Sequence, residues 1–306
     1  MKCIFIYNPK SGKGQVFKNI NYIANELKKK FEIVDIHETI SQQDTIDTAQ
    51  KACDQYDAII FSGGDGTFND ITCGIAAMDK RPILGYIPTG TVNDIARNLK
   101  ISKNIKKAMK TIIDGKYVNH DVGKVNDTYF MYVAALGTFA ATSFRTKHKY
   151  KKIFGKFAYL LDGIQEVINP SIVEVDVVTE EGERFTNQTP LLLVMNSISA
   201  GGVPFNKNGH MNDGKFDIVI VKKYMGSGII GIANTVLSGL RKKRITKYYQ
   251  LIRSSKFDIT VNSDITWAID GQEGMKGSIT IDNLHNHIQI YVPFKKGKPL
   301  SKHLKA

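Results

Sequence analysis

The amino-acid sequence predicts an α/β protein of two domains, an N-terminal doubly wound parallel sheet followed by a domain of mainly antiparallel strands. Its 306 residues suffice for about two domains at roughly 150 residues each. Up to about residue 120, short apolar runs alternate with segments of helical periodicity, as in parallel strands joined by helices. After Asp121, short strand-like runs separated by turn residues predominate.

The first domain contains four apolar runs that we expect to form strands. Continuous apolar runs are typical of parallel strands buried on both faces. The expected strands cover residues 2–7, 31–36, 58–61 and 83–87. The expected helices cover residues 16–30, 44–53, 71–78 and 105–112. Because ligands bind at the carboxyl ends of such strands, we expect functional loops there.

The second domain is expected to be rich in antiparallel strands. The expected strands cover residues 124–133, 172–179, 190–197, 216–221, 256–261 and 279–281. Two helices, at residues 154–168 and 228–240, are expected to interrupt them. We place the domains at residues 1–122 and 123–286, and expect residues 287–306, with a last strand at 288–292, to return to the first domain.

Charge and cysteine content restrict the class of protein. The formal net charge of +13 favours an anionic partner, which could be a phosphorylated small molecule, an acidic membrane surface or nucleic acid. Cys3, Cys53 and Cys73 are odd in number and form no CxxC pair, which argues against a zinc site and a disulfide framework and favours a reducing cytoplasm. The sequence shows neither a signal peptide nor an apolar stretch of the ~20 residues that a membrane span needs.

Three loops that follow expected strands carry the chemistry. The first is Asn8-Pro9-Lys10-Ser11-Gly12-Lys13-Gly14, whose small residues let backbone N–H groups approach a phosphate at the start of a helix. It lacks the first glycine and the Ser/Thr of a Walker A loop, which excludes a P-loop NTPase. An ordinary strand-to-helix turn is the alternative for this loop taken alone.

The second and third loops are rich in glycine and side-chain oxygen. The second loop is Gly63-Gly64-Asp65-Gly66-Thr67-Phe68-Asn69-Asp70, in which a carboxylate suited to Mg²⁺ stands among three glycines. The third loop is Pro88-Thr89-Gly90-Thr91-Val92-Asn93-Asp94, where Thr91 can donate to a phosphate oxygen. Asn93 or Asp94 could instead cap the following helix.

Together, NPKSGKG, GGDGTFND and PTGTVNDIAR resemble the diacylglycerol kinase catalytic family, in particular its soluble bacterial lipid kinases. Gly201-Gly202, the segment Asn212–Asp217 and Asp270-Gly271 extend the resemblance over nearly the whole chain. It implies an NAD-kinase/diacylglycerol-kinase-like first domain that holds ATP, with catalysis in the cleft between the domains. NAD kinase shares the GGDGT loop, but the other two loops disfavour that alternative.

The resemblance also implies roles for individual residues. The implied nucleotide contacts are Asn8, Pro9, Lys10, Ser11, Gly12, Lys13, Thr39, Gly64, Asp65, Gly66, Thr67, Phe68, Asn69, Asp70 and Thr91. Asp65, Asp94 and Asp121 resemble the acidic residues that organise catalytic Mg²⁺, which neutralises phosphate oxygens during phosphoryl transfer. A second, structural Mg²⁺ is implied at His210, Asp213 and Lys215, through the Asp213 carboxylate and main-chain oxygens.

The expected general base is replaced in this chain. Where the family usually has Asp-Gly-Glu, this sequence has Asp270-Gly271-Gln272-Glu273, and an amide cannot accept the proton of a hydroxyl. Glu273 could take the role, Asp270 or another aspartate could substitute, or the chain is a nucleotide- and lipid-binding regulator with little activity. We favour an active enzyme, because Gly271 and Gly274 allow a turn that re-aims Glu273.

The implied reaction transfers the γ-phosphate of ATP to a hydroxyl of diacylglycerol or a related lipid, forming a phospholipid such as phosphatidic acid. Asp162 stands near a position where related bacterial members carry lysine, which weakens the assignment to diacylglycerol. Lys147, Lys149, Lys151, Lys152 and Lys156, and the run Arg241-Lys242-Lys243-Arg244, predict reversible peripheral binding to the anionic inner face of the membrane. Solvated basic faces are the alternative. No nucleic-acid-binding motif accompanies the charge. A homodimer remains open.

Overall fold

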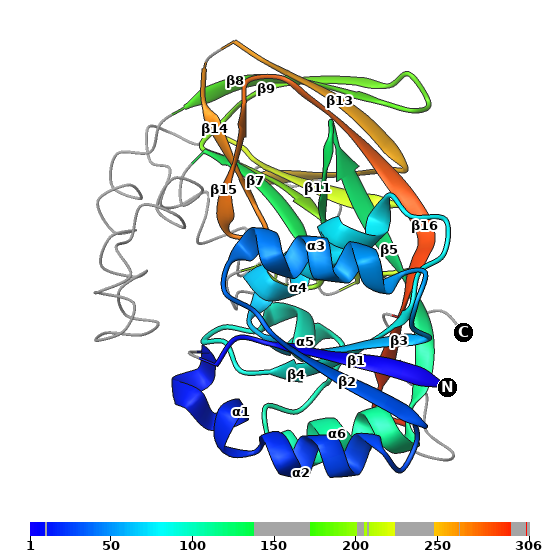
Figure 1. Cartoon of the computed structure of the whole chain (residues 1–306). Helices are drawn as coiled ribbons and strands as arrows, with labels where there is room; N and C mark the ends of the chain where they lie inside the picture. Colours follow the sequence, from blue (N-terminus) through cyan, green and yellow to red (C-terminus); the bar gives the residue numbers. More distant parts are fainter. Residues whose placement is uncertain are drawn as a thin grey trace. The chain divides into compact units, whose positions relative to one another are not determined.

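The computed structural model describes residues 1–9, 11–137, 172–200, 205–206, 208–223, 248–262, 264–294 and 304 (Figure 1). They fall into two compact units. The first unit comprises Met1–Val122 and His285–Ala306, and the second comprises Gly123–Leu284. By their residue ranges, strands β5 (Lys116–Val125) and β16 (Ile279–Val292) belong to both units. The helices expected at 154–168 and 228–240 lie outside the described residues.

The first unit is built on a parallel sheet in the strand order β2-β1-β3-β4-β16. The first four strands are β1 (Lys2–Tyr7), β2 (Ile33–Glu38), β3 (Ala58–Gly63) and β4 (Ile83–Pro88). The end of β16 joins the sheet where Ile290 pairs with Leu84. This confirms the predicted doubly wound domain, and it brings the carboxyl ends of β1 to β4 to the same edge.

Helices cover both faces of this sheet (Figure 1). On one face lie α1 (Gln15–Lys18), α2 (Ile20–Leu27) and α6 (Ile105–Asp114), and on the other lie α3 (Gln42–Ala52) and α4 (Asp65–Ala76). Two short helices, η1 (Ser11–Gly14) and α5 (Asp94–Asn98), follow β1 and β4. Phe5 and Ile60 pack with Ile23 and Met109 in a fully buried core. No helix in the described ranges is long and apolar enough to cross a membrane.

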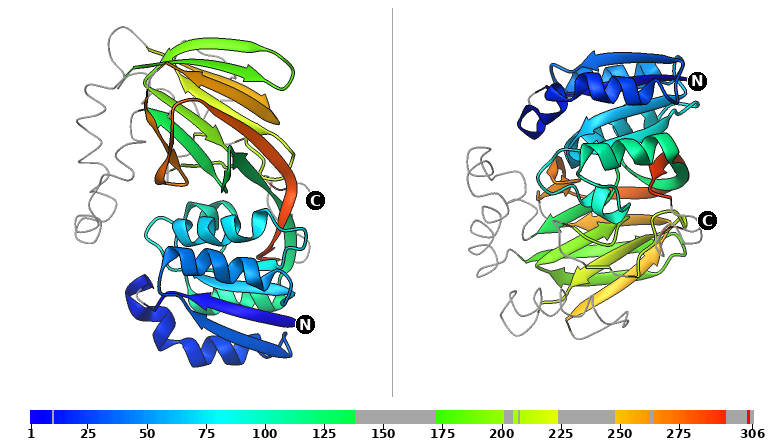
Figure 2. Two further views of the ribbon diagram at one scale, coloured as in Figure 1. Left: turned by 45° about the horizontal axis from the view of Figure 1, so that its top comes forward. Right: turned by 90° about the horizontal axis from the view of Figure 1, so that it is seen from below.

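The second unit consists of antiparallel strands (Figure 2). One sheet has the order β12-β11-β10-β7-β14-β15, from Tyr249–Ser254, Phe216–Val221, Leu191–Met195, Val133–Gly137, Thr266–Ile269 and Gln272–Lys276. The beginning of β16 continues through β13 (Lys256–Val261) and β8 (Val173–Thr179) to β9 (Arg184–Thr189). Trp267 is fully buried in this unit's core and its indole N–H donates to the Gly277 carbonyl at 2.8 Å.

Three local expectations were wrong. The strand expected over residues 124–133 is a hairpin, in which β5 turns at Asn126 and returns as β6 (Thr128–Phe130). Asn126 has a φ of 48°, a conformation that Asn adopts more readily than most residues and that reverses the chain there. The helix expected over 16–30 is interrupted at Asn19, and the strands expected at 279–281 and 288–292 are one continuous strand, β16. Strands β7, β9, β12, β14 and β15 were not expected.

Candidate nucleotide and metal site

The ends of four parallel strands place the predicted loops together in the first unit. Register pairs Tyr7 of β1 with Glu38 of β2 and with Ser62 of β3, and pairs Gly63 with Pro88 of β4. Ser11-Gly12, Thr39, the second loop and the third loop therefore all leave the same sheet edge. Only backbone and small side chains occupy most of these positions, which is the composition that phosphate groups require for close approach.

Direct contact between glycines joins the second and third loops. A Cβ atom on Gly90 would lie 2.5 Å from the Cα atom of Gly64, a distance that real side chains do not tolerate. Gly12 has a φ of +56°, and a Cβ there would lie 2.8 Å from the Cβ atom of Thr89. Any side chain at these positions would force the loops apart.

Asn93 fixes the shape of the third loop. It has the left-handed φ of 53° that favours Asn or Gly, and its amide nitrogen donates to the Gly90 carbonyl at 2.5 Å. Its Oδ1 accepts from the Gly90 N–H at 3.0 Å and from the buried Tyr86 hydroxyl at 3.2 Å. The side chain makes no helix-capping hydrogen bond, so the alternative expectation of a cap was wrong for Asn93.

The carboxylates of Asp65 and Asp94 are electrostatically coupled. Asp65 accepts a hydrogen bond from the Ile95 N–H at 3.2 Å, while Asp94, fully buried, pairs with Arg97 at 2.7 Å. Burial raises the pKa of Asp65, and the negative charge of Asp94 raises it further, although backbone N–H donors oppose this. Two nearby carboxylates with one arginine leave negative charge that a cation would neutralise.

This donor set fits the catalytic Mg²⁺ that the sequence predicts. Mg²⁺ in kinase sites is held by one or two carboxylates together with phosphate oxygens and water, so Asp65 and Asp94 suffice on the protein side. Asp121 is also fully buried, and its Oδ1 accepts from the Asn286 N–H at 2.7 Å. No three Asp, Glu, His or Cys side chains among the described residues gather closely enough to ligate one ion directly. Three direct ligands from Asp65, Asp94 and Asp121 are therefore not assembled.

The remaining predicted nucleotide contacts differ in their exposure to solvent. Thr91 is exposed at the third loop, and Asn8 is exposed after β1. Thr39 is buried, with its backbone N–H bonded to the Tyr7 carbonyl at 2.9 Å. The backbone of Lys13 lies in η1, whereas Lys10 and the side chain of Lys13 lie outside the described residues.

The expectation that Phe68 contacts the nucleotide is corrected by its burial. Its ring is fully buried and packs edge-on against Phe61 and Tyr86. Its N–H donates within α4 to the Gly64 carbonyl. Farther along α4, Asp70 accepts from the Gln42 amide at 2.7 Å, and Asn69 is buried. Phe68 therefore supports the second loop from the core side.

The position predicted for the second Mg²⁺, around Asp213, lies beside an arginine. The guanidinium of Arg253 contacts the Asp213 carboxylate and lies 3.8 Å from that of Asp217. His210 Nδ1 lies 3.5 Å from Asp213, while Lys215 pairs with Glu181 at 3.4 Å. One arginine thus balances part of the charge of two carboxylates, and the second Mg²⁺ stays a prediction.

Asp270 is held by the backbone that faces it. Its carboxylate accepts from the N–H groups of Met131, Tyr132 and Val133 at 2.6, 3.0 and 3.0 Å. Asp270 and Gly271 have φ values of 49° and 81°, so they form a two-residue hairpin turn of the type I′ kind. Three N–H donors bind the carboxylate, which makes Asp270 a good anchor for the turn.

The residues after this turn point to opposite faces of the sheet. Gln272 pairs with Ile269 and Glu273 pairs with Ala268, and the register then shifts before Thr266 pairs with Lys276. Because paired residues share a face, half-buried Gln272 lies on the side of Ile269, which belongs to the core. Glu273 lies on the opposite side and is exposed. The irregularity therefore lies beyond Glu273, and Gln272 and Glu273 themselves alternate between the two faces of the strand.

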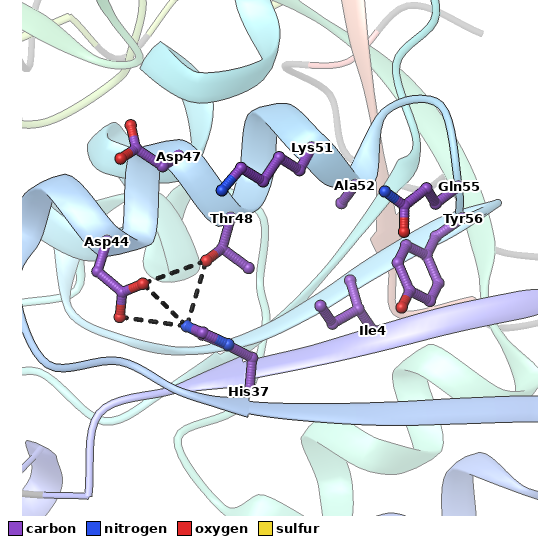
Figure 3. Close-up of a pocket in the computed structure, with 9 residues that line it drawn as sticks. All are labelled: Ile4, His37, Asp44, Asp47, Thr48, Lys51, Ala52, Gln55 and Tyr56. Atoms are coloured by element: carbon purple, nitrogen blue, oxygen red, sulfur yellow. Dashed lines mark hydrogen bonds and ion pairs between the residues drawn. The ribbon is translucent and has the colours of Figure 1, made fainter.

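A groove of about 300 Å³ lies on the α3 side of β1 and β2 (Figure 3). Its lining comprises Ile4, His37, Asp44, Asp47, Thr48, Lys51, Ala52, Gln55 and Tyr56. His37 Nε2 lies 3.1 Å from both Asp44 oxygens and 3.2 Å from the Thr48 hydroxyl. The Ile40 N–H and then His37 lower the pKa of Asp44. These contacts hold the loop after β2, which carries Thr39, against α3.

The substitution Asp65→Asn is expected to raise the free energy of unfolding at neutral pH. Because the folded-state pKa of Asp65 is raised, its ionised form costs stability above that pKa. As the pH falls through this pKa, Asp65 of the folded wild-type protein becomes protonated. The difference in free energy of unfolding between the variant and the wild type should then shrink. Urea unfolding across pH measures this, with exposed Asp79→Asn as the control. A variant less stable than wild type at pH 7 would contradict the explanation.

Nucleotide-free protein should have the same thermal midpoint in excess EDTA and in millimolar Mg²⁺, because Arg253 supplies the positive charge beside Asp213. Arg253→Met should lower the free energy of unfolding by about 3 kcal/mol, since it removes the guanidinium from beside two buried carboxylates. Differential scanning calorimetry measures both. A Mg²⁺-dependent rise of the midpoint that Asp213→Asn abolishes would show a metal ion at this place.

Comparison with known proteins identifies the family. Residues 2–125 match the model of the diacylglycerol kinase catalytic domain. A diacylglycerol kinase of Bacillus subtilis (strain 168) is 32% identical over 303 residues, covering 96% of this chain and 97% of the relative.

Solved structures confirm the predicted fold class. A crystal structure of a diacylglycerol kinase from Bacillus anthracis has a TM-score of 0.81 at 27% identity and covers 95% of this chain and 97% of that one. A yeast NADH kinase structure, with a TM-score of 0.50 at 12% identity over 97% of this chain and 84% of that one, shares the fold alone. The two compact units, the ordered loops and the full-length relationship lead to one conclusion: this chain belongs to the diacylglycerol kinase family of lipid kinases.

Proposed function

We propose that this protein transfers the γ-phosphate of ATP to a hydroxyl of a membrane lipid, with Mg²⁺ as cofactor. The observation that carries the proposal is the glycine contact between Gly64 and Gly90 beside the coupled carboxylates of Asp65 and Asp94. The first feature suits phosphate groups, and the second suits the divalent ion that accompanies them.

Each part of the site has a task in phosphoryl transfer. The N–H groups at the start of α4, together with the first loop, would bind phosphate oxygens, since a helix N-terminus carries partial positive charge. Asp65 and Asp94 would hold Mg²⁺, which supplies neutralisation of the charge on the transferring phosphoryl group. Asn93 and Tyr86 keep the third loop closed so that exposed Thr91 faces the same edge.

Glu273 is the proton acceptor that this proposal assigns. It is an exposed carboxylate at the position next to that of the family's usual glutamate, while Gln272 has no basic atom. Asp270 accepts hydrogen bonds from three N–H groups, and it would fix the turn that precedes Gln272 and Glu273. Because Gln272 and Glu273 lie on opposite faces of the sheet, one of them at most addresses the acceptor hydroxyl.

Diacylglycerol, or a related lipid with a free hydroxyl, is the proposed acceptor, since the Bacillus relatives are named diacylglycerol kinases. The net charge of +13 supports reversible binding at the anionic inner face of the membrane from the cytoplasm. The lysine cluster at residues 147–156, the basic run at 241–244, and Asp162 lie outside the described residues. The identity of the lipid and this location rest on the relationship and the charge.

A second candidate function rests on Gln272. If the hydroxyl is addressed from the face of Gln272, no side chain there accepts its proton, and the protein would bind nucleotide and lipid with little catalysis.

An assay with radiolabelled ATP and mixed micelles should distinguish these functions. We expect label in a lipid when diacylglycerol and a panel of total membrane lipids are offered, and none in NAD offered in parallel. Asp65→Asn should lower the rate by ~100-fold or more, because it removes a carboxylate that holds Mg²⁺. Label in NAD with none in any lipid would refute the proposal, whereas ATP binding without label in either acceptor would favour the regulator.

Paired substitutions test the proton acceptor. If Glu273 is the base, Glu273→Gln should lower kcat by ~10²–10⁴-fold and leave the ATP affinity unchanged, while Gln272→Glu changes the rate only modestly. Exposed Glu183→Gln, in the turn between β8 and β9, serves as the matched control. Wild-type kcat in Glu273→Gln, together with a sharp gain in Gln272→Glu, would remove Glu273 from the mechanism.

A further inference from the structure

The side chain of Thr89, in the third loop, contacts both the first loop and strand β3. Its hydroxyl lies 2.9 Å from the Ser11 hydroxyl in the first loop and 3.3 Å from the Ser62 hydroxyl near the end of β3. Its backbone N–H donates to the Gly63 carbonyl at 2.8 Å.

The three hydroxyl groups form a chain in which each bond has a donor and an acceptor. A hydroxyl carries one hydrogen and two lone pairs, so Thr89 can donate to one serine and accept from the other. Ser62 is fully buried, and losing its partner would leave a buried polar group with fewer hydrogen bonds. These hydroxyl hydrogen bonds therefore link segments that are distant in sequence, since Ser11 and Thr89 are separated by 78 positions.

The methyl side of Thr89 has a separate contact. A Cβ atom on Gly12 would meet the Thr89 Cβ at 2.8 Å and the Thr89 Cγ2 at 3.4 Å, so the glycine backbone packs directly on the threonine side chain. The hydroxyl and the packing surface of one residue thus set the position of Ser11-Gly12 relative to the third loop. Gly90, the next residue, in turn contacts Gly64 of the second loop.

We propose that Thr89 is a positioning residue for nucleotide phosphates: through Ser11 and Ser62 it aligns the first loop with the other two, so that their backbone donors converge on one anion. This rests on the proposed binding of ATP at these loops. Thr89 acts through its neighbours, and no direct contact with the nucleotide is assigned to it.

The isosteric variant Thr89→Val removes the hydroxyl and keeps the shape, while Thr89→Ser keeps the hydroxyl and removes the methyl group. Hydrogen exchange in nucleotide-free protein should be faster over residues 11–14 in Thr89→Val and close to wild type in Thr89→Ser. Thr111→Val, which removes a hydroxyl bonded within α6, is the matched control and should leave this exchange unchanged.

Calorimetric titration with ATP supplies the second measurement. Thr89→Val should bind ATP about tenfold more weakly, equivalent to ~1.4 kcal/mol, with kcat at saturating ATP near that of wild type. Ser11→Ala breaks the chain from its other end, and combining it with Thr89→Val should add little to either single effect. This serine variant also keeps the test informative if Thr89→Val fails to fold.

Two outcomes would overturn the assignment. One is a folded Thr89→Val with wild-type exchange over residues 11–14 and wild-type ATP affinity. The other is an impaired Thr89→Ser beside an unimpaired Thr89→Val, which would assign the role to packing of the methyl group instead of to the hydroxyl chain. Absence of ATP binding by wild-type protein would refute the proposed function, whereas the exchange experiment judges Thr89 without any nucleotide.

Discussion

The backbone contact between Gly64 and Gly90 is the constraint on which the rest of the first unit's site depends. Parallel strands β3 and β4 end side by side, and the two loops can meet only because neither residue has a side chain. Once they meet, Asp65 reaches the N–H of Ile95 in the helix after the third loop. The position of the carboxylate pair therefore follows from the absence of two side chains.

Four aspartates show how the surroundings of a carboxylate determine what it can do. Asp270 is stabilised by three N–H groups and Asp213 by a guanidinium, so the protein itself stabilises both anions. Asp94 pairs with Arg97, and burial raises the pKa of Asp65. A divalent ion gains most where charge is left uncompensated, which favours the pair in the first unit.

The sequence predicted the parallel domain well. Continuous apolar runs such as Ala58-Ile59-Ile60-Phe61 are typical of parallel strands buried on both faces, and the glycines that follow mark where the strand ends. It missed β9, whose residues are mostly polar and lie on an edge strand, so they lack the apolar pattern of a buried strand. It misjudged Phe68, since a motif gives no information on which side of a helix faces the core.

Arg253 and Thr89 escaped prediction for a different reason. Each acts on a partner distant in sequence, Asp213 for the arginine and Ser11 for the threonine, and no local pattern reports such pairs. Periodicity identifies elements and motifs identify loops, but contacts between side chains depend on how those elements pack. Long-range contacts of this kind could be found only from the structure.

The hairpin at Asp270-Gly271 shows how backbone geometry limits the choice of proton acceptor. Positive φ at both turn residues fixes a two-residue connection, and this sets the pairing of Ile269 with Gln272. Strand alternation then assigns Gln272 to the core face and Glu273 to the other. Because Asp270 is anchored to three N–H groups, a one-residue slip that exchanged the faces would have to break all of those hydrogen bonds. The acceptor lipid must therefore approach the face of Glu273 if that residue is the base.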